Sequence, residues 1–259
     1  VADKVIDATD KAVSPGFINM LSWAYNSLMD DGRSLSDLKQ GVTLEVFGEG
    51  TSPGPSGNIK DNSYVSFGEA MQKLEDNGVS PNIASYLGAA TVRIQEIGYA
   101  NRKATDEEME SMREIVKSAM EEGAIGIGSS LIYAPGDYAD TDELIELSKV
   151  ASSYGGRYIS HMRNEDSRIL SAVDELIEIA EKADIPAEIY HLKASRKANY
   201  HLLDSVISRV EEARSKGLKI TADMYTYTAS STGLTGVIPT WVQEGGREAW
   251  INRMKRPDI

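Results

Sequence analysis

The sequence predicts a parallel α/β fold, a (β/α)₈ TIM-type barrel with strands one to seven present, and three observations support this. Short apolar runs alternate with amphipathic stretches along nearly the whole chain, as in βα repeats around a parallel sheet. The runs recur about every 25–45 residues, so seven units use roughly 210 residues of a barrel of about 250. No Gly-x-Gly-x-x-Gly motif follows the first run, which disfavours the alternative, a doubly wound open sheet.

The expected strands are the apolar runs themselves. In chain order they are Pro15 to Met20, Thr43 to Gly48, Asn82 to Leu87, Ala124 to Ser129, Arg157 to His161, Ala187 to His191 and Leu218 to Asp223. The eighth strand of such a barrel would lie beyond Ile259, so the barrel is expected to be incomplete at its C-terminus.

Helix signals separate these strands. Thr105-x-x-Glu108 and Ser66-x-x-Glu69 read as capping boxes, and Asp140-x-x-Glu143 opens a third helix. Apolar residues recur at helical spacing from Asp166 to Ala183 and from Leu202 to Lys216. By contrast, residues 1–13 (VADKVIDATDKAV) are polar and show no helical period. They predict the end of a small β-sandwich domain, with the barrel at 14–259.

Composition narrows the classes of function. The chain has 259 residues and a net charge of −13, which disfavours nucleic acid and anionic membranes as partners. No apolar run approaches the ~20 residues of a membrane span, and no signal peptide is visible, so we expect a cytoplasmic protein. Assembly into a homo-oligomer stays open as a possibility. The chain has no Cys, so any metal must use His, carboxylate, backbone or water.

Two of the three histidines, His161 and His191, end consecutive predicted strands. The C-terminal ends of parallel barrel strands form the active-site mouth, and neighbouring strands lie about 4.8 Å apart. Two imidazoles placed there can share one metal ion, although two hydrogen-bonded core histidines are the structural alternative. Glu49, between two glycines after the second strand, is the candidate third ligand; it can also be a plain loop charge. The third histidine, His201, is expected at a helix end or surface.

Polar residues near these positions are candidates for binding substrate. Lys193 and Arg163 each lie two residues beyond a predicted histidine ligand and can bind a carboxylate, although such residues are more often solvated loop cations. Tyr225 and Ser231 follow the seventh strand and offer hydroxyl groups, or they serve turns and packing.

These motifs resemble the N-acyl-D-amino-acid deacylase (D-aminoacylase) branch of the amidohydrolase superfamily. The matching segments keep the family's order and cover nearly the whole chain: Ser14 to Asn19 (SPGFIN), Gly41 to Thr43 (GVT), Gly128 to Gly136 (GSSLIYAPG), Ser160 to Glu165 (SHMRNE), His191 to Ala194 (HLKA) and Thr221 to Thr232 (TADMYTYTASST). The resemblance implies His161 and His191 as metal ligands. It also implies Tyr133, Lys193, Tyr225 and Ser231 as substrate contacts.

The chain departs from the family pattern at three places. The family usually carries His-x-His at the end of the first strand, where this chain has Leu21 and Trp23. The family's Cys ligand after the second strand is absent, and Glu49 or Gly50 falls in its place. The family's catalytic Asp would lie beyond Ile259. These departures predict at most one metal ion.

Together these features predict a metal-dependent hydrolase that cleaves the amide bond of N-acyl (D-)amino acids by attack of a metal-activated water. One divalent ion, with Zn²⁺ favoured, would be its cofactor. Two alternatives stay open. One is a related hydrolase of cyclic or other small amides, and the other is a barrel that binds a small ligand after losing the His-x-His metal site.

Overall fold

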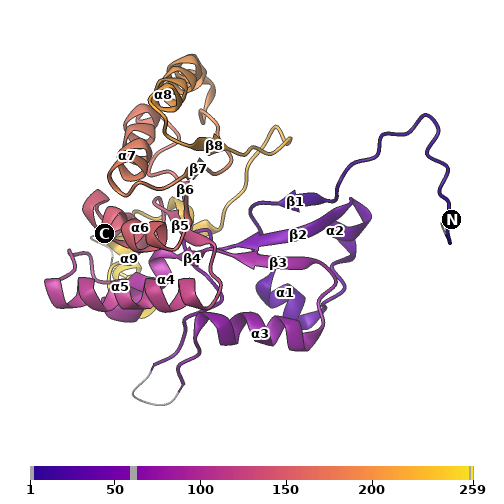
Figure 1. The fold of residues 1–259 in the computed structure, drawn as a ribbon. Coiled ribbons are helices and arrows are strands. Elements are labelled where there is room, and N and C mark those ends of the chain that lie inside the picture. Colours follow the sequence, from indigo (N-terminus) through magenta and orange to yellow (C-terminus); the bar gives the residue numbers. More distant parts are fainter. Residues whose placement is uncertain (1–2, 59–62, 257, 259) are drawn as a thin grey trace.

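The computed structural model describes residues 3–58, 63–256 and 258. Its strands form two parallel sheets in chain order, β1-β2-β3 and β4-β5-β6-β7-β8 (Figure 1). The strands are β1 (Phe17–Asn19), β2 (Val42–Phe47), β3 (Asn82–Ser85), β4 (Leu87–Gly88), β5 (Gly126–Ser130), β6 (Arg157–His161), β7 (Ala187–Ile189) and β8 (Ile220–Ala222). All seven predicted strand positions therefore carry strands.

The third predicted strand, Asn82 to Leu87, is divided in the structure. Only Tyr86 separates β3 from β4, and the Tyr86 amide donates to the Phe47 carbonyl at 2.9 Å. Just beyond, Gly88 lies so close to Thr51 that a Cβ there would stand 2.4 Å from the Thr51 Cα. The loop after β2 thus passes directly over β4, and only a residue without a side chain fits beneath it.

Helices connect successive strands. They are α1 (Tyr25–Asp30), α2 (Leu35–Lys39), α3 (Phe67–Asn77), α4 (Ala89–Glu96), α5 (Asp106–Glu121), α6 (Thr141–Ser153), α7 (Ile169–Lys182), α8 (Leu203–Ser215), α9 (Thr240–Gln243) and α10 (Arg247–Met254), with short 3₁₀ helices η2 (Gly136–Tyr138), η3 (Lys197–Leu202) and η4 (Leu234–Val237). The capping boxes predicted at Ser66 and Thr105 both form, and the Asp140 side chain accepts from the Glu143 amide.

The main core lies between the second sheet and the helices outside it. Ile127 and Ile189 on the strands are fully buried there, as are Met112, Leu144 and Val173 on α5, α6 and α7. A smaller cluster occupies the opposite face of the strands and contains Val46, Tyr86, Ile159 and Tyr190. The central strands β5, β6 and β7 are therefore buried on both faces, as expected for a parallel sheet, whereas β1 and β8 are largely exposed.

Strands β1 and β8 are the first and last strands in chain order, and β3 and β4, separated by Tyr86, are the other edge strands of the two sheets. Within the described residues β1 and β8 each pair with a neighbour on one side only, β1 with β2 and β8 with β7. Figure 1 shows β1 and β8 apart. The parallel α/β fold is thus confirmed, whereas closure into an eight-stranded barrel stays a prediction.

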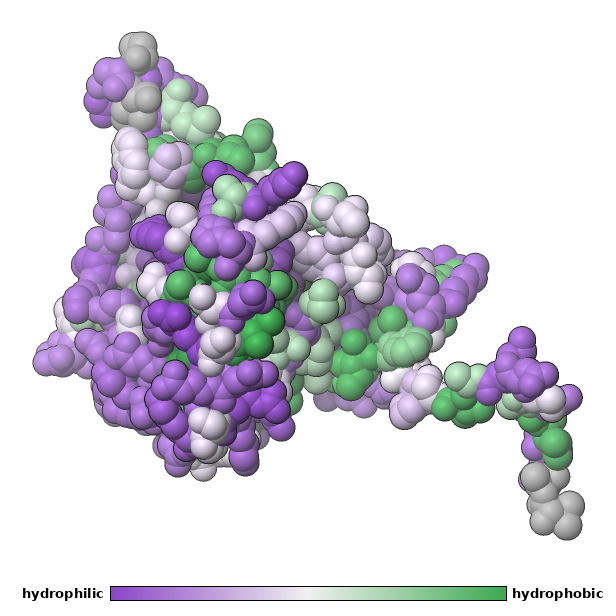
Figure 2. Space-filling model, turned by 90° about the horizontal axis from the view of Figure 1, so that it is seen from above, coloured by the Kyte–Doolittle hydropathy of each residue, from purple (hydrophilic) through white to green (hydrophobic). Residues whose placement is uncertain are grey.

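Residues 3–16 carry no helix or strand and project from the body of the molecule (Figure 2). Val5, Ile6 and Val13 in this arm are 77–84% exposed. Val1 and Ala2 of the predicted domain end lie outside the described residues. None of the described helices is long and apolar enough to cross a lipid bilayer.

Candidate metal centre

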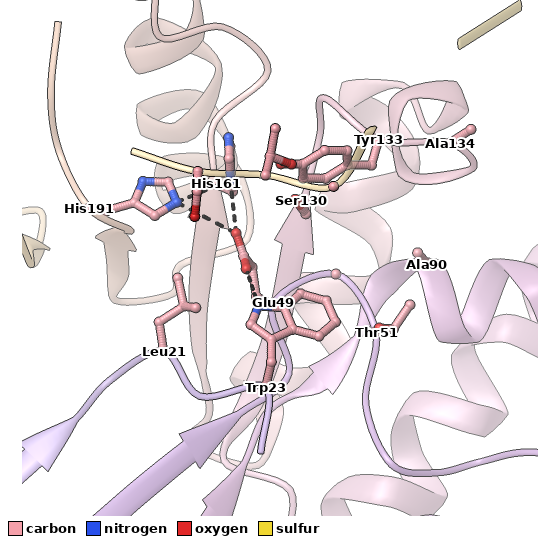
Figure 3. Close-up of a pocket in the computed structure, with 14 residues that line it drawn as sticks. Leu21, Trp23, Glu49, Thr51, Ala90, Ser130, Tyr133, Ala134, His161 and His191 are labelled. Carbon is pink, nitrogen blue, oxygen red and sulfur yellow. Dashed lines mark hydrogen bonds and ion pairs between the residues drawn. The ribbon is translucent and has the colours of Figure 1, made fainter. Parts of the chain in front are cut away.

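Three side chains meet at the C-terminal end of the strands (Figure 3). Glu49 stands two residues after β2, His161 is the last residue of β6, and His191 stands two residues after β7. Glu49 and His161 are buried and His191 is nearly so. Parallel strands deliver their last residues to one rim, so residues 112 and 30 positions apart in sequence become neighbours.

One carboxylate oxygen and two ring nitrogens converge in this centre. Glu49 Oε1 lies 2.8 Å from His161 Nδ1 and 3.5 Å from His191 Nε2. The two ring nitrogens are 3.1 Å apart, and the rings stand nearly perpendicular, at 87°. All three atoms have lone pairs that a shared cation would satisfy.

Trp23 and Glu165 hold this centre from two sides. The Trp23 indole Nε1 donates to Glu49 Oε2 at 2.7 Å. His191 Nδ1 lies 2.9 Å from Glu165 Oε1, to which the Lys193 ammonium also donates at 2.6 Å. A proton on Nδ1, held by Glu165, leaves the Nε2 lone pair of His191 facing Glu49.

The charges at the centre shift two pKa values strongly. Burial by itself would raise the pKa of Glu49, but hydrogen bonds from His161, His191 and Trp23 lower it to about 2. Burial would lower the pKa of His191, but hydrogen bonds to Glu165 and Glu49 raise it to about 9. Glu49 is therefore an anion at neutral pH, and His191 holds a proton unless a cation takes its place.

The backbone at His191 is also constrained. Its φ is +37°, a conformation that non-glycine residues rarely adopt. Its amide donates to Asp223 Oδ1 at 2.6 Å, just beyond β8. Burial raises the pKa of Asp223. This bond holds the strained turn that aims the imidazole into the rim.

A cavity of about 490 Å³ opens over the centre. Glu49, His161 and His191 form its floor, and Trp23, Tyr133 and Ser231 stand among its walls. The Tyr133 ring contacts His161 edge to face, with centroids 5.7 Å apart, and its hydroxyl lies 2.7 Å from Thr232 Oγ1. A small polar molecule in this cavity would touch the centre directly.

Three of the predicted substrate contacts lie outside the cavity wall. The Arg163 guanidinium forms two bonds of 2.9–3.0 Å with the Glu175 carboxylate on α7 and donates to the carbonyls of Asp137 and Ala139. Arg163 therefore links the rim to the scaffold. Lys193 is engaged by Glu165, and the Tyr225 ring packs near Lys193 and His191. The third histidine, His201, is exposed in η3, as expected.

Sequence patterns assign no role to Glu165 or Asp223, and Trp23 stands out in them only as a departure from the family's His-x-His. Glu165 carries one detectable signal, a carboxylate four residues after His161 in the same loop. Trp23 and Asp223 act through contacts between different strand ends, which local spacing does not reveal.

The residues present fit a divalent cation. Two imidazole nitrogens and one carboxylate oxygen lie within 4.8 Å of one another, which is the donor set of three-ligand catalytic zinc sites. The carboxylate is ionised, and Glu165 holds one imidazole in the orientation that such a ligand needs.

The fold is similar to that of solved amidohydrolases. The structure is similar to a crystal structure of D-aminoacylase described as defining a subset of amidohydrolases, with a TM-score of 0.75 and 28% identity over 83% of this chain and 48% of that one. A second D-aminoacylase structure, described as having a binuclear metal center with one-metal activation and second-metal attenuation, gives a TM-score of 0.73 and 27% identity over 82% of this chain and 48% of that one.

The sequence comparison defines the branch. D-aminoacylase from Alcaligenes xylosoxydans xylosoxydans is 30% identical over 242 residues, which are 88% of this chain and 50% of that protein. The chain is therefore a homologue within the D-aminoacylase branch of the amidohydrolases, which confirms the resemblance predicted from its motifs. No protein-family model matches it. The chain spans about half the length of the curated relatives it matches.

Proposed function

We propose that the protein is a metal-dependent hydrolase that cleaves the amide bond of N-acyl-D-amino acids. The observation that carries the proposal is the meeting of Glu49, His161 and His191 at the floor of an open cavity. The homology to D-aminoacylase supports the choice of amide substrates.

In this proposal one divalent ion, Zn²⁺ by its donor set, is held by Glu49, His161 and His191. When bound, such an ion polarises an amide carbonyl and lowers the pKa of water. Glu49 contributes a full negative charge, and Glu165 fixes the ring of His191. The Lys193 ammonium neutralises Glu165, so the rim does not accumulate uncompensated negative charge.

The cavity wall supports a substrate with an uncharged side chain. Apart from the three proposed ligands, the described residues that line the cavity are all uncharged, and Leu21, Trp23 and Ala90 are apolar. Tyr133 and Ser231 line the same cavity, and their hydroxyl groups can accept or donate hydrogen bonds to the substrate's polar groups. A side-chain carboxylate, in addition to the α-carboxylate that every N-acyl amino acid carries, would lose its hydration here without gaining a cation from the described lining residues.

The proton acceptor of the reaction is proposed to be the family's Asp on the eighth strand of the barrel, beyond Ile259. Strand β8 is the seventh barrel strand, because β3 and β4 together occupy the position of the third. Among the described residues that line the cavity, Glu49 is the one carboxylate, and it is occupied by the imidazoles and Trp23. In the same proposal residues 1–13 complete a small sandwich domain.

The test is hydrolysis by the full-length protein of N-acetyl-D- and N-acetyl-L-amino acids, with neutral and acidic side chains, before and after chelation. We expect chelator-sensitive release of neutral D-amino acids. His161→Ala should remove both the ion and the activity, whereas His201→Ala, at an exposed position, serves as the matched control. A protein that binds no ion yet still binds these compounds would instead be a ligand-binding barrel.

A further inference from the structure

The two oxygens of the Glu49 carboxylate have different partners. Oε1 faces the imidazoles of His161 and His191, at 2.8 and 3.5 Å. Oε2 accepts the indole N–H of Trp23 at 2.7 Å. Figure 3 shows the indole on the side of Glu49 away from the two rings.

An indole N–H is a hydrogen-bond donor without a lone pair, so it cannot ligate a cation. The positive end of this N–H dipole points at Oε2, so the second oxygen of Glu49 is already engaged and would be less available to a second cation. Leu21, on the same loop and in the same cavity wall, adds only hydrocarbon. Among the described residues on this side of Glu49, a second ion would therefore meet only a carboxylate oxygen that already accepts a hydrogen bond, together with the positive end of the indole N–H dipole.

We propose that Trp23 limits Glu49 to ligation through a single oxygen and that Leu21 and Trp23, which offer no ligand atom at this wall, leave the centre with one ion. This inference rests on the proposed function, in which Glu49, His161 and His191 hold that ion. It assigns to Trp23 a positioning role, exerted through the ligand carboxylate.

The indole ring has a separate part in the cavity wall. Trp23 is 61% exposed, so most of the ring surface is free to contact a substrate while the N–H is engaged. Replacing Trp23 with Phe keeps an aromatic wall and removes only the donor. The Phe variant thus separates the effect on Glu49 from the effect on substrate packing.

The first experiment is elemental analysis of the full-length protein after saturation with Zn²⁺ and dialysis. We expect one ion per chain in the wild type and in Trp23→Phe, and two in a Leu21→His/Trp23→His double variant, which offers two new nitrogens beside Oε2. Two ions in the wild type would overturn this inference and leave the proposed function standing. No ion in the wild type would overturn both.

The second experiment does not depend on the double variant folding. The difference infrared spectrum between Zn²⁺-loaded and metal-free protein reports how the carboxylate binds, and Glu49→Gln identifies its bands. We expect a wide separation of the two carboxylate stretches in the wild type, as for one-oxygen ligation, and a narrower one in Trp23→Phe. Identical spectra, or a double variant that keeps one ion, would refute the role of Trp23.

Discussion

In the proposed metal centre a proton and the metal ion compete for His191, which leads to a quantitative prediction. Because the pKa of His191 is about 9 in the metal-free chain, about one molecule in a hundred has the neutral ring at pH 7. A histidine ligand must be neutral, so binding an ion releases this proton. The affinity at pH 7 is thus reduced by about 2.7 kcal/mol from its high-pH limit, at about 1.36 kcal/mol per pH unit.

The expected result is an apparent association constant for Zn²⁺ that rises about tenfold per pH unit, or about a hundredfold from pH 6 to pH 8. Competition with a chelator of known affinity measures the constant. Calorimetry in buffers of different ionisation enthalpy counts the released proton. Glu165→Gln removes the acceptor that favours the charged ring, so its rise should be shallower. A wild-type constant that changes less than about threefold over this interval would refute the reasoning.

Three further predictions concern charge and burial. In metal-free protein, kept so by a chelator, the raised pKa of His191 contributes its full stabilisation of the fold below pH 6.5. As pH rises through about 9, up to about 3 kcal/mol of the free energy of unfolding is lost. Denaturant titration should show this loss in the wild type and not in His191→Asn. Glu49→Gln should retain no ion after dialysis and lower kcat/KM more than about a hundredfold, since even outer-shell changes cost up to that much; activity at the wild-type level would contradict Glu49 as a ligand. Arg93→Met leaves the buried Glu143 carboxylate without its 2.5 Å partner, and urea unfolding should show a loss of about 3–5 kcal/mol, largely restored by adding Glu143→Leu.

Much of the fold was predictable because its information is local. Apolar runs and capping residues placed every strand and the starts of α3, α5 and α6, since hydrogen bonds within one turn decide a helix start. The break at Tyr86 was not predictable from the run Asn82 to Leu87. It lies next to the close approach of Thr51 to Gly88, a contact between segments 37 residues apart that no periodicity encodes.

The candidate site likewise has residues whose positions were predictable from the sequence and residues whose contacts were not. His161, His191 and Glu49 follow strand ends, so the topology alone brought them to one rim. Arg163 also follows a strand end, yet its guanidinium turns to Glu175, because a carboxylate on the next helix stabilises it better than open solvent at the cavity. The sequence contains both residues but does not state which cation meets which anion.

The loop that Arg163 anchors and the segment after β8 differ in how firmly they are tied to the scaffold, and this difference matters for changing substrate specificity. Arg163 ties the loop that follows His161 to α7 and to two backbone carbonyls, whereas residues 223–233, before η4, lack helix or strand and contribute Ser231 and Thr232 to the cavity wall. Residues 226–233 therefore contribute to the cavity wall without holding a proposed ligand of the ion, whereas Asp223 holds the turn of His191, and Trp23 both lines the wall and binds Glu49. Directed evolution confined to 226–233 should explore new acyl and side-chain preferences without dismantling the chemical centre, giving this scaffold a modular route to altered selectivity.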